Sequence, residues 1–161
     1  MKAKSIKGKS TEEITTALAE SMADGFKHTL AIIFLSTSQN KKAISELLDK
    51  TGVQVFGATS NGEFTDEVPE KQSTAILLLD MNPAHFQILH TVYQEGNFKE
   101  VAASLAVKVK EQIHNPAFLI AGSHSSTDAE ALLKGFEEVI GPQVNVYGGM
   151  AGDDFTFSEQ F

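Results

Sequence analysis

The apolar residues of this chain follow two alternating patterns, one with the spacing of a helix and one with the continuous runs of a buried strand. Apolar residues from Ile14 to Met22 recur at helical spacing, and the run from His28 to Leu35 is mostly apolar. Strands that are apolar on both faces are typical of a sheet covered by helices. The pattern predicts helices at 10–24, 42–50, 97–113 and 128–139, and strands at 3–7, 28–35, 53–56, 73–80, 86–93, 117–121 and 144–147.

The middle of the chain differs from the parts on either side, because two β-rich runs follow each other there without a helix between them. The short connection Asn82-Pro83 separates Ser73–Asp80 from Phe86–Tyr93 and predicts an antiparallel hairpin. We therefore expect an α/β fold, a mixed sheet with flanking helices. It would consist of two related helix–strand–helix–strand halves with an intervening β-hairpin.

The two halves also resemble each other residue by residue. Val53–Phe64 aligns without a gap to Val144–Phe155, and Val, Val, Gly and Phe recur in register. Ile14–Ser36 aligns in the same way to Val101–Ser123. Identical residues in this second overlay are Leu18/Leu105, Ala19/Ala106, Ile33/Ile120 and Ser36/Ser123. Because the two matches agree in their order along the chain, we predict an internal duplication.

Each half ends in a strand that runs into a turn of glycines, small polar residues and an acid. Ligands of α/β sheets gather at the carboxyl ends of strands, and four such ends would converge here: Ser36–Asn40, Thr59–Glu63, Ser123–Thr127 and Gly149–Asp154. If the two turns lie side by side, they form one ligand site. Its predicted residues are Thr59, Ser60, Asn61, Gly62, Glu63, Ser125, Gly148, Gly149, Asp153 and Asp154.

The chemistry of these residues favours a small zwitterion or polar metabolite, because hydroxyls, amides and acids are present with almost no bases. Glu63 and either Asp153 or Asp154 would hold an ammonium group. Thr59, Ser60, Asn61 and the backbone amides of Gly148 and Gly149 would hold a carboxylate or carbonyl.

Composition and charge exclude several other classes of protein. The chain has no cysteine, so disulfides and thiolate sites are absent. A formal net charge of −8 argues against a nucleic-acid partner, which needs a basic face. The longest apolar run, Leu30–Leu35, is far shorter than the ~20 residues of a membrane span. With no secretory signal visible near the N-terminus, we expect a soluble cytoplasmic protein.

Known catalytic and cofactor motifs do not match either turn. Neither turn fits G-x-G-x-x-G or a P-loop, and the histidines lack the spacing of a zinc site, so we expect no metal. A serine hydrolase would need Ser60 or Ser125 near His124 and a carboxylate; we expect no enzyme activity. A haem-based gas sensor stays open, because one exposed histidine over an apolar slot suffices to hold haem.

The segments Val55–Phe64 and Val146–Asp154 resemble the two signature segments of the FIST N-terminal domain, a Gly-small-Ser/Thr-x-Gly-Glu turn and a Gly-Gly-x-Ala-Gly-Asp turn. Leu132–Gly141 is similar to the family's helix before the second turn, and the resemblance covers nearly the whole chain, residues 1–161. Ala58 stands where many relatives carry a cysteine.

The resemblance implies an intracellular sensory domain of signal transduction. Ligands proposed for the family are small molecules such as amino acids, and some members are reported to bind haem and sense nitric oxide. Its partners would be signalling proteins such as a histidine kinase, a cyclase or a chemoreceptor. It also implies a C-terminal FIST half that this chain lacks. We therefore expect the domain to be incomplete at its C-terminus, as the end at Phe161 soon after the second turn also suggests.

Overall fold

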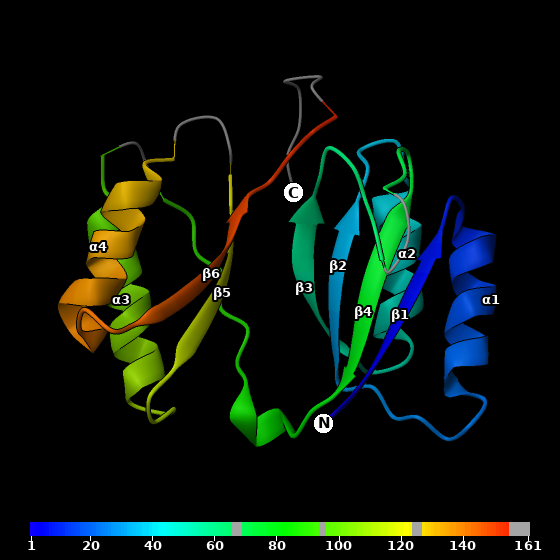
Figure 1. The fold of residues 1–161 in the computed structure, drawn as a ribbon, viewed down its shortest axis with the longest axis horizontal. Helices are drawn as coiled ribbons and strands as arrows, with labels where there is room; N and C mark the ends of the chain where they lie inside the picture. The colour runs from blue at the N-terminus through cyan, green and yellow to red at the C-terminus, as the bar shows by residue number, and fades with distance from the viewer. Residues whose placement is uncertain (66–68, 94–95, 124–126, 155–161) are drawn as a thin grey trace. The chain divides into compact units, whose positions relative to one another are not determined.

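The computed structural model describes residues 1–65, 69–93, 96–123 and 127–154. The chain divides into two compact units (Figure 1). Unit 1 consists of Met1–Pro83 together with the segment that begins at Ala151, and unit 2 consists of Ala84–Met150. Each unit is described by itself.

Unit 1 is built on a mixed sheet of four strands in the order β1-β4-β2-β3. The strands are β1 (Lys2–Gly8), β2 (Leu30–Leu35), β3 (Gln54–Thr59) and β4 (Thr74–Asp80). β2 and β3 run parallel, and β4 is antiparallel to both β1 and β2. The sheet agrees with the predicted α/β class.

Helices α1 (Thr11–Met22) and α2 (Lys41–Asp49) cover one face of this sheet (Figure 1). Ser10 caps α1 by accepting a hydrogen bond from the Glu13 amide at 3.2 Å, and the Glu13 carboxylate accepts one from the Lys9 amide at 2.8 Å. Apolar residues one or two turns apart face the sheet and are fully buried. The core of unit 1 includes Ile14, Leu18, Ile44 and Leu48 from the helices and Ala31, Ile33, Ile76 and Leu78 from the strands.

The hairpin predicted from Ser73–Asp80 and Phe86–Tyr93 is not formed by the described residues. β4 pairs with β1 on one edge, from Lys2↔Asp80 to Gly8↔Thr74, and with β2 on the other. Because both edges of β4 are occupied, no edge is left for residues 86–93, which form no strand. A short 3₁₀ helix η1 (Pro83–His85) follows instead of a tight turn.

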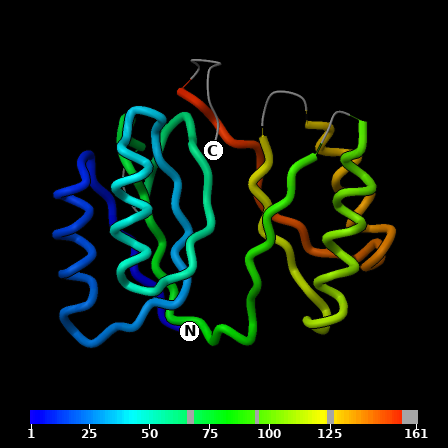
Figure 2. The backbone as a smooth tube through the Cα atoms, turned by 180° about the vertical axis from the view of Figure 1, so that it is seen from behind, coloured from blue at the N-terminus to red at the C-terminus, as the bar shows by residue number. Residues whose placement is uncertain are grey.

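Unit 2 holds helices α3 (Phe98–Lys110) and α4 (Ala129–Ile140) and the parallel strands β5 (Ala117–Gly122) and β6 (Asn145–Met150). Both helices pack on the same face of the strand pair (Figure 2). Phe118 and Phe136 lie at the centre of this second core, with ring centroids 4.5 Å apart. Asp128 caps α4 by accepting a hydrogen bond from the Ala131 amide at 2.9 Å.

Each unit contains a helix–strand–helix–strand segment, as the predicted duplication requires. β2 and β5 cover corresponding residues of the sequence overlay, and so do β3 and β6. Their registers also correspond, because Leu30↔Gln54 in unit 1 matches Ala117↔Asn145 in unit 2. The duplication is therefore present in strand pairing as well as in sequence.

A glycine occupies the corresponding position of β3 and of β6, where the backbone lies close to the neighbouring strand. Gly57 lies opposite Ile33, and Gly148 lies opposite Ile120. A Cβ on Gly57 would lie 1.9 Å from the Ile33 carbonyl oxygen, and one on Gly148 would lie 2.0 Å from that of Ile120. Gly148 also has a φ of 118°, which other residues rarely adopt. Both glycines are thus required by the fold.

We predict that Gly148→Ala destabilises unit 2 by more than about 2 kcal/mol, because the backbone of β5 would have to move. Gly149→Ala is the matched control, since a Cβ there meets nothing within 4 Å. It should change the free energy of unfolding by less than about 0.5 kcal/mol. Urea unfolding followed by circular dichroism compares the two variants. Equal stability of the two would contradict the assigned close approach.

His28 is a partly buried histidine whose surroundings predict how the stability of the fold depends on pH. Its Nε2 lies 3.1 Å from the Thr51 hydroxyl, while its buried Nδ1 has no hydrogen-bond partner among the described residues. Burial lowers the pKa of His28 below its usual value. The native state therefore resists protonation of this ring, whereas the unfolded chain takes up the proton at a pKa of about 6.5.

Stability should consequently fall as the pH drops from 7.5 through 6.5 to 5.5, because the unfolded state binds more protons there. His28→Gln removes this contribution, so the loss on acidification should be smaller in the variant than in the wild type. Urea midpoints at the two pH values measure both losses. An equal or larger loss in His28→Gln would contradict the prediction.

Candidate functional site

The first and second glycine turns meet at the carboxyl ends of the strands of unit 1. The Gly152 amide donates to the Thr59 carbonyl at 2.8 Å, and the Asp154 amide donates to Asn61 Oδ1 at 2.8 Å. A Cβ on Gly152 would lie 2.6 Å from the same side-chain oxygen and 2.9 Å from the backbone nitrogen of Asn61, so there is no room for a side chain at this position. Residues 152–154 therefore lie directly against residues 59–61.

Asp154 joins this contact to the end of the neighbouring strand β2. Its Oδ2 accepts hydrogen bonds from the Ser36 hydroxyl at 2.5 Å, the Thr37 amide at 3.0 Å and the Thr37 hydroxyl at 3.1 Å. All three bonds end on one oxygen, and among the described residues Oδ1 has no partner. Asp154 is half-buried and has a φ of 57°, a left-handed conformation that this short side chain tolerates.

Glu63 is the second carboxylate of the cluster, and its hydrogen bonds lie within unit 1. Oε1 accepts from the Ser60 hydroxyl at 2.8 Å. Oε2 accepts from the amide and the hydroxyl of Ser73, at 3.1 and 3.0 Å. Only 2% of Glu63 is exposed. This geometry makes Glu63 a residue that positions Ser60 and the start of β4.

Glu63 and Asp154 are carboxylates whose hydrogen bonds come from uncharged groups. Every partner that the described chain supplies to Glu63 and Asp154 is a hydroxyl or an amide. Nearby, Lys7 and Lys9 form ion pairs with Glu70 at 3.0 and 3.1 Å, and their hydrogen bonds lower the pKa of that carboxyl. The ammonium groups of both lysines therefore interact with the Glu70 carboxylate. Carboxylates without a counter-charge favour a cationic group as ligand.

The predicted site residues are distributed over both units. Thr59, Ser60, Asn61, Gly62, Glu63, Asp153 and Asp154 belong to unit 1, and Thr59 and Asp153 are buried there. Gly148 and Gly149 lie on β6 and belong to unit 2. Ser125 lies outside the described residues. The contact of the two turns thus brings together residues 59–61 and 152–154.

The sequence pattern gives little or no indication of two parts of the cluster, Ser36–Thr37 and Ser73. Ser36 and Thr37 follow a buried strand and could be found as a strand end, but no local motif indicates that they bind Asp154. Ser73 belongs to no recognisable motif. The antiparallel β-bridge between Glu63 and Glu70 returns the chain to the neighbourhood of Glu63 shortly before Ser73. The contacts of these residues with the two acids are identified by tertiary structure alone.

The hydrolase hypothesis depended on residues that the structure places differently or does not describe. The Ser60 hydroxyl donates to Glu63 rather than to a histidine. His124 and Ser125 lie outside the described residues.

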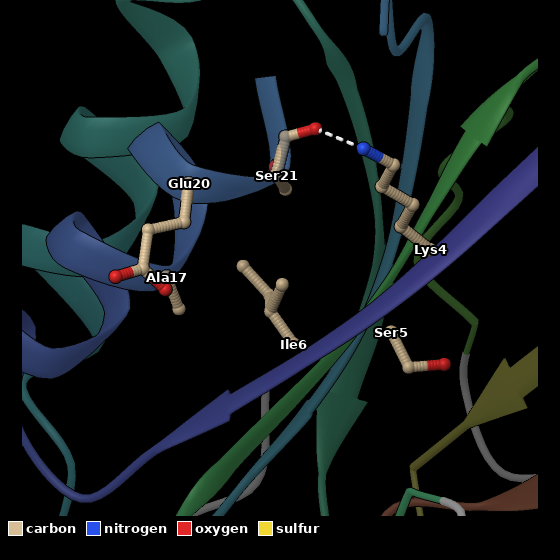
Figure 3. Close-up of a pocket in the computed structure, with 6 residues that line it drawn as sticks. All are labelled: Lys4, Ser5, Ile6, Ala17, Glu20 and Ser21. Atoms are coloured by element: carbon tan, nitrogen blue, oxygen red, sulfur yellow. Dashed lines mark hydrogen bonds between the residues drawn. The ribbon is translucent and has the colours of Figure 1, made fainter. Parts of the chain in front are cut away.

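A separate hollow lies between β1 and α1 and is lined by Lys4, Ser5, Ile6, Ala17, Glu20 and Ser21 (Figure 3). Lys4 points across it and donates to the Ser21 carbonyl at 2.6 Å, and the same ammonium group pairs with Asp24 at 2.8 Å. Lys4 also lies 5.1 Å from the centroid of the Phe26 ring. Because its charged group is engaged in these contacts, we assign the hollow a structural role.

Comparison with known proteins identifies the family. The family model described as FIST N domain matches residues 29–161, most of the chain, and the chain belongs to this family. FIST domains are sensory domains of signal transduction, a family that is not catalytic. No curated protein and no solved structure matches the chain. None of the helices in the described ranges is long and apolar enough to cross a membrane.

We predict that Glu63→Gln lowers the free energy of unfolding by about 1–3 kcal/mol, because an amide NH₂ would replace one oxygen that accepts a hydrogen bond. Glu46→Gln is the control, since its side chain is 59% exposed and makes a single long ion pair with Lys42, at 3.8 Å. It should change stability by less than about 0.5 kcal/mol. A Glu63 variant as stable as the control, measured by urea unfolding, would remove the structural role of Glu63.

Proposed function

We propose that this sensory domain binds a small polar molecule with an ammonium group, such as an amino acid, at the cluster around Asp154. The observation that carries the proposal is the Asp154 carboxylate itself. It is half-buried, its partners are uncharged, and one of its oxygens, Oδ1, has no partner among the described residues. An ammonium group would supply the missing charge and hydrogen bond.

The neighbouring side chains suit the other end of such a ligand. Asn61 uses its Oδ1 to accept from the Asp154 backbone, which leaves its NH₂ group to donate to a carboxylate or carbonyl. Glu63 holds the Ser60 hydroxyl in place. Contributions from Asp153 and Gly62, which also belong to unit 1, stay part of the proposal.

Ligand binding at this position would act on more than one structural element. Asp154 already connects the residues after β2 with the residues after β3 and with the second turn. A ligand that binds only the connected arrangement would increase its population and so bias a partner protein. The partner of this proposal is a signalling protein such as a histidine kinase, a cyclase or a chemoreceptor.

The proposal is tested by thermal shift of the chain against a panel of amino acids, related amines and carboxylates, and haemin. A ligand present at about 100 times its dissociation constant stabilises by ~2.7 kcal/mol. We expect a rise of roughly 5–10 °C for compounds that carry an ammonium group, and no rise for the corresponding carboxylates without it.

Asp154→Asn should abolish this rise, and Asp49→Asn, which removes one exposed acid at the end of α2, should retain it. A rise that survives in Asp154→Asn would contradict the site. A response to haemin alone, with a strong visible absorption band, would contradict the proposed class of ligand and favour the gas-sensor alternative.

A further inference from the structure

Asn61-Gly62 is the only place in the sequence where an asparagine precedes a glycine. Because glycine has no Cβ, its backbone nitrogen is unhindered. Such a nitrogen can attack the side-chain carbonyl carbon of the preceding asparagine and close a five-membered succinimide ring. The other five asparagines precede residues with a bulkier side chain or, for proline, without a backbone N–H: Lys41, Pro83, Phe98, Pro116 and Val146.

The position of Asn61 in the fold leaves both reacting groups accessible. Asn61 lies after the end of β3, outside any helix or strand, and it is exposed to the water that the reaction needs. The amide of Gly62 has no acceptor among the described residues, whereas the next amide, that of Glu63, donates to the Glu70 carbonyl at 3.0 Å. The attacking nitrogen is therefore not engaged in the β-bridge beside it.

The side-chain carbonyl of Asn61 already has a hydrogen-bond donor directed at its oxygen. Asn61 Oδ1 accepts from the Asp154 backbone amide at 2.8 Å. When the carbonyl carbon is attacked, negative charge develops on this oxygen, and a donor held in place stabilises that charge. Within the described part of the chain, no hydrogen bond holds the side-chain nitrogen, which is the leaving group.

We propose that Asn61 is a site of spontaneous deamidation in the native fold. The Gly62 nitrogen loses its proton to solvent and bonds to Asn61 Cγ; the Cγ–Nδ2 bond breaks, and ammonia leaves with a proton taken from water. Water then opens the succinimide. Cleavage between Cγ and the Gly62 nitrogen gives aspartate at position 61, and cleavage at the main-chain carbonyl carbon gives isoaspartate. The net reaction consumes one water and releases one ammonia.

Both products place a new carboxylate beside Asp154. The side-chain NH₂ group of Asn61 is lost, and with it the donor that we assign to the carboxylate of an amino acid. Isoaspartate also lengthens the backbone by one carbon just before Glu63, which positions Ser60. Weaker binding of amino acids is therefore expected after deamidation. This consequence rests on the proposed function, whereas the reaction itself needs no ligand and is measured without one.

The test follows the full chain by mass spectrometry during incubation at pH 8.0 and 37 °C. We expect a mass gain of about 1 Da in the tryptic peptide of residues 51–71, located at Asn61. It should appear as two products of equal mass, aspartate and isoaspartate, which chromatography separates. The Asn61→Asp variant identifies the first of them. Asn40 and Asn145, which lie in other tryptic peptides, should stay unchanged over the same time.

Gly62→Ala is the matched control. An added Cβ there meets only the Glu70 carbonyl oxygen, at 3.7 Å, which is an ordinary contact, so the variant should keep the fold. Its Asn61 should deamidate at least tenfold more slowly, because the methyl group hinders the attacking nitrogen. Wild-type chain unfolded in urea at the same pH is the second reference, since it lacks the hydrogen bond from Asp154. We expect the native chain to react at least as fast as the unfolded one.

Three outcomes would overturn the proposal. The first is an unchanged mass of the native chain over a time in which the unfolded chain reacts, or a slower reaction in the native chain. Either result would show that the fold opposes ring closure. The second is an equal rate in folded Gly62→Ala, and the third is a mass gain located at Gln54 of the same peptide. If Gly62→Ala does not fold, the comparison of native and unfolded wild type still decides.

Discussion

The close approach of paired parallel strands at a glycine is the constraint on which both units depend. Gly57 and Gly148 occupy the same position of the duplicated pattern, and each lies against the carbonyl of an isoleucine that is identical in the two halves. The contact occurs at the same position in the register of β3 on β2 and of β6 on β5. In unit 1 the register brings Ser36 and Thr59–Ser60 to the same edge of the sheet, and the candidate site is assembled there.

Much of the fold could be predicted from the sequence, because helical spacing and buried strand runs are local signals. The helices and most of the strands follow from residues close together in the chain, and the duplication follows from comparing its two halves. The pairing of β4 could not be predicted in this way. The connection Asn82-Pro83 favours a hairpin locally, yet β1, far away in sequence, occupies the edge of β4 that a hairpin would need.

The candidate site shows the same division between local and tertiary information. Glycines and acids at the turns mark residues 59–63 and 149–154 in the sequence. The roles of the two acids needed the structure. Glu63 is enclosed by Ser60 and Ser73, whereas Asp154 keeps one oxygen without a partner among the described residues. Sequence spacing alone does not distinguish a carboxylate with both oxygens enclosed by hydrogen bonds from one with an oxygen left for a ligand.

We propose that a small ammonium-bearing ligand binds where Asp154 meets Asn61 and Thr37. The most direct measurement is a ¹H–¹⁵N NMR titration of the chain with an amino acid selected from the panel. We expect the largest shifts at the Asn61 side-chain NH₂ and the Thr37 backbone amide, with one saturable curve for both. Shifts that saturate elsewhere, with these two signals unchanged, would contradict it.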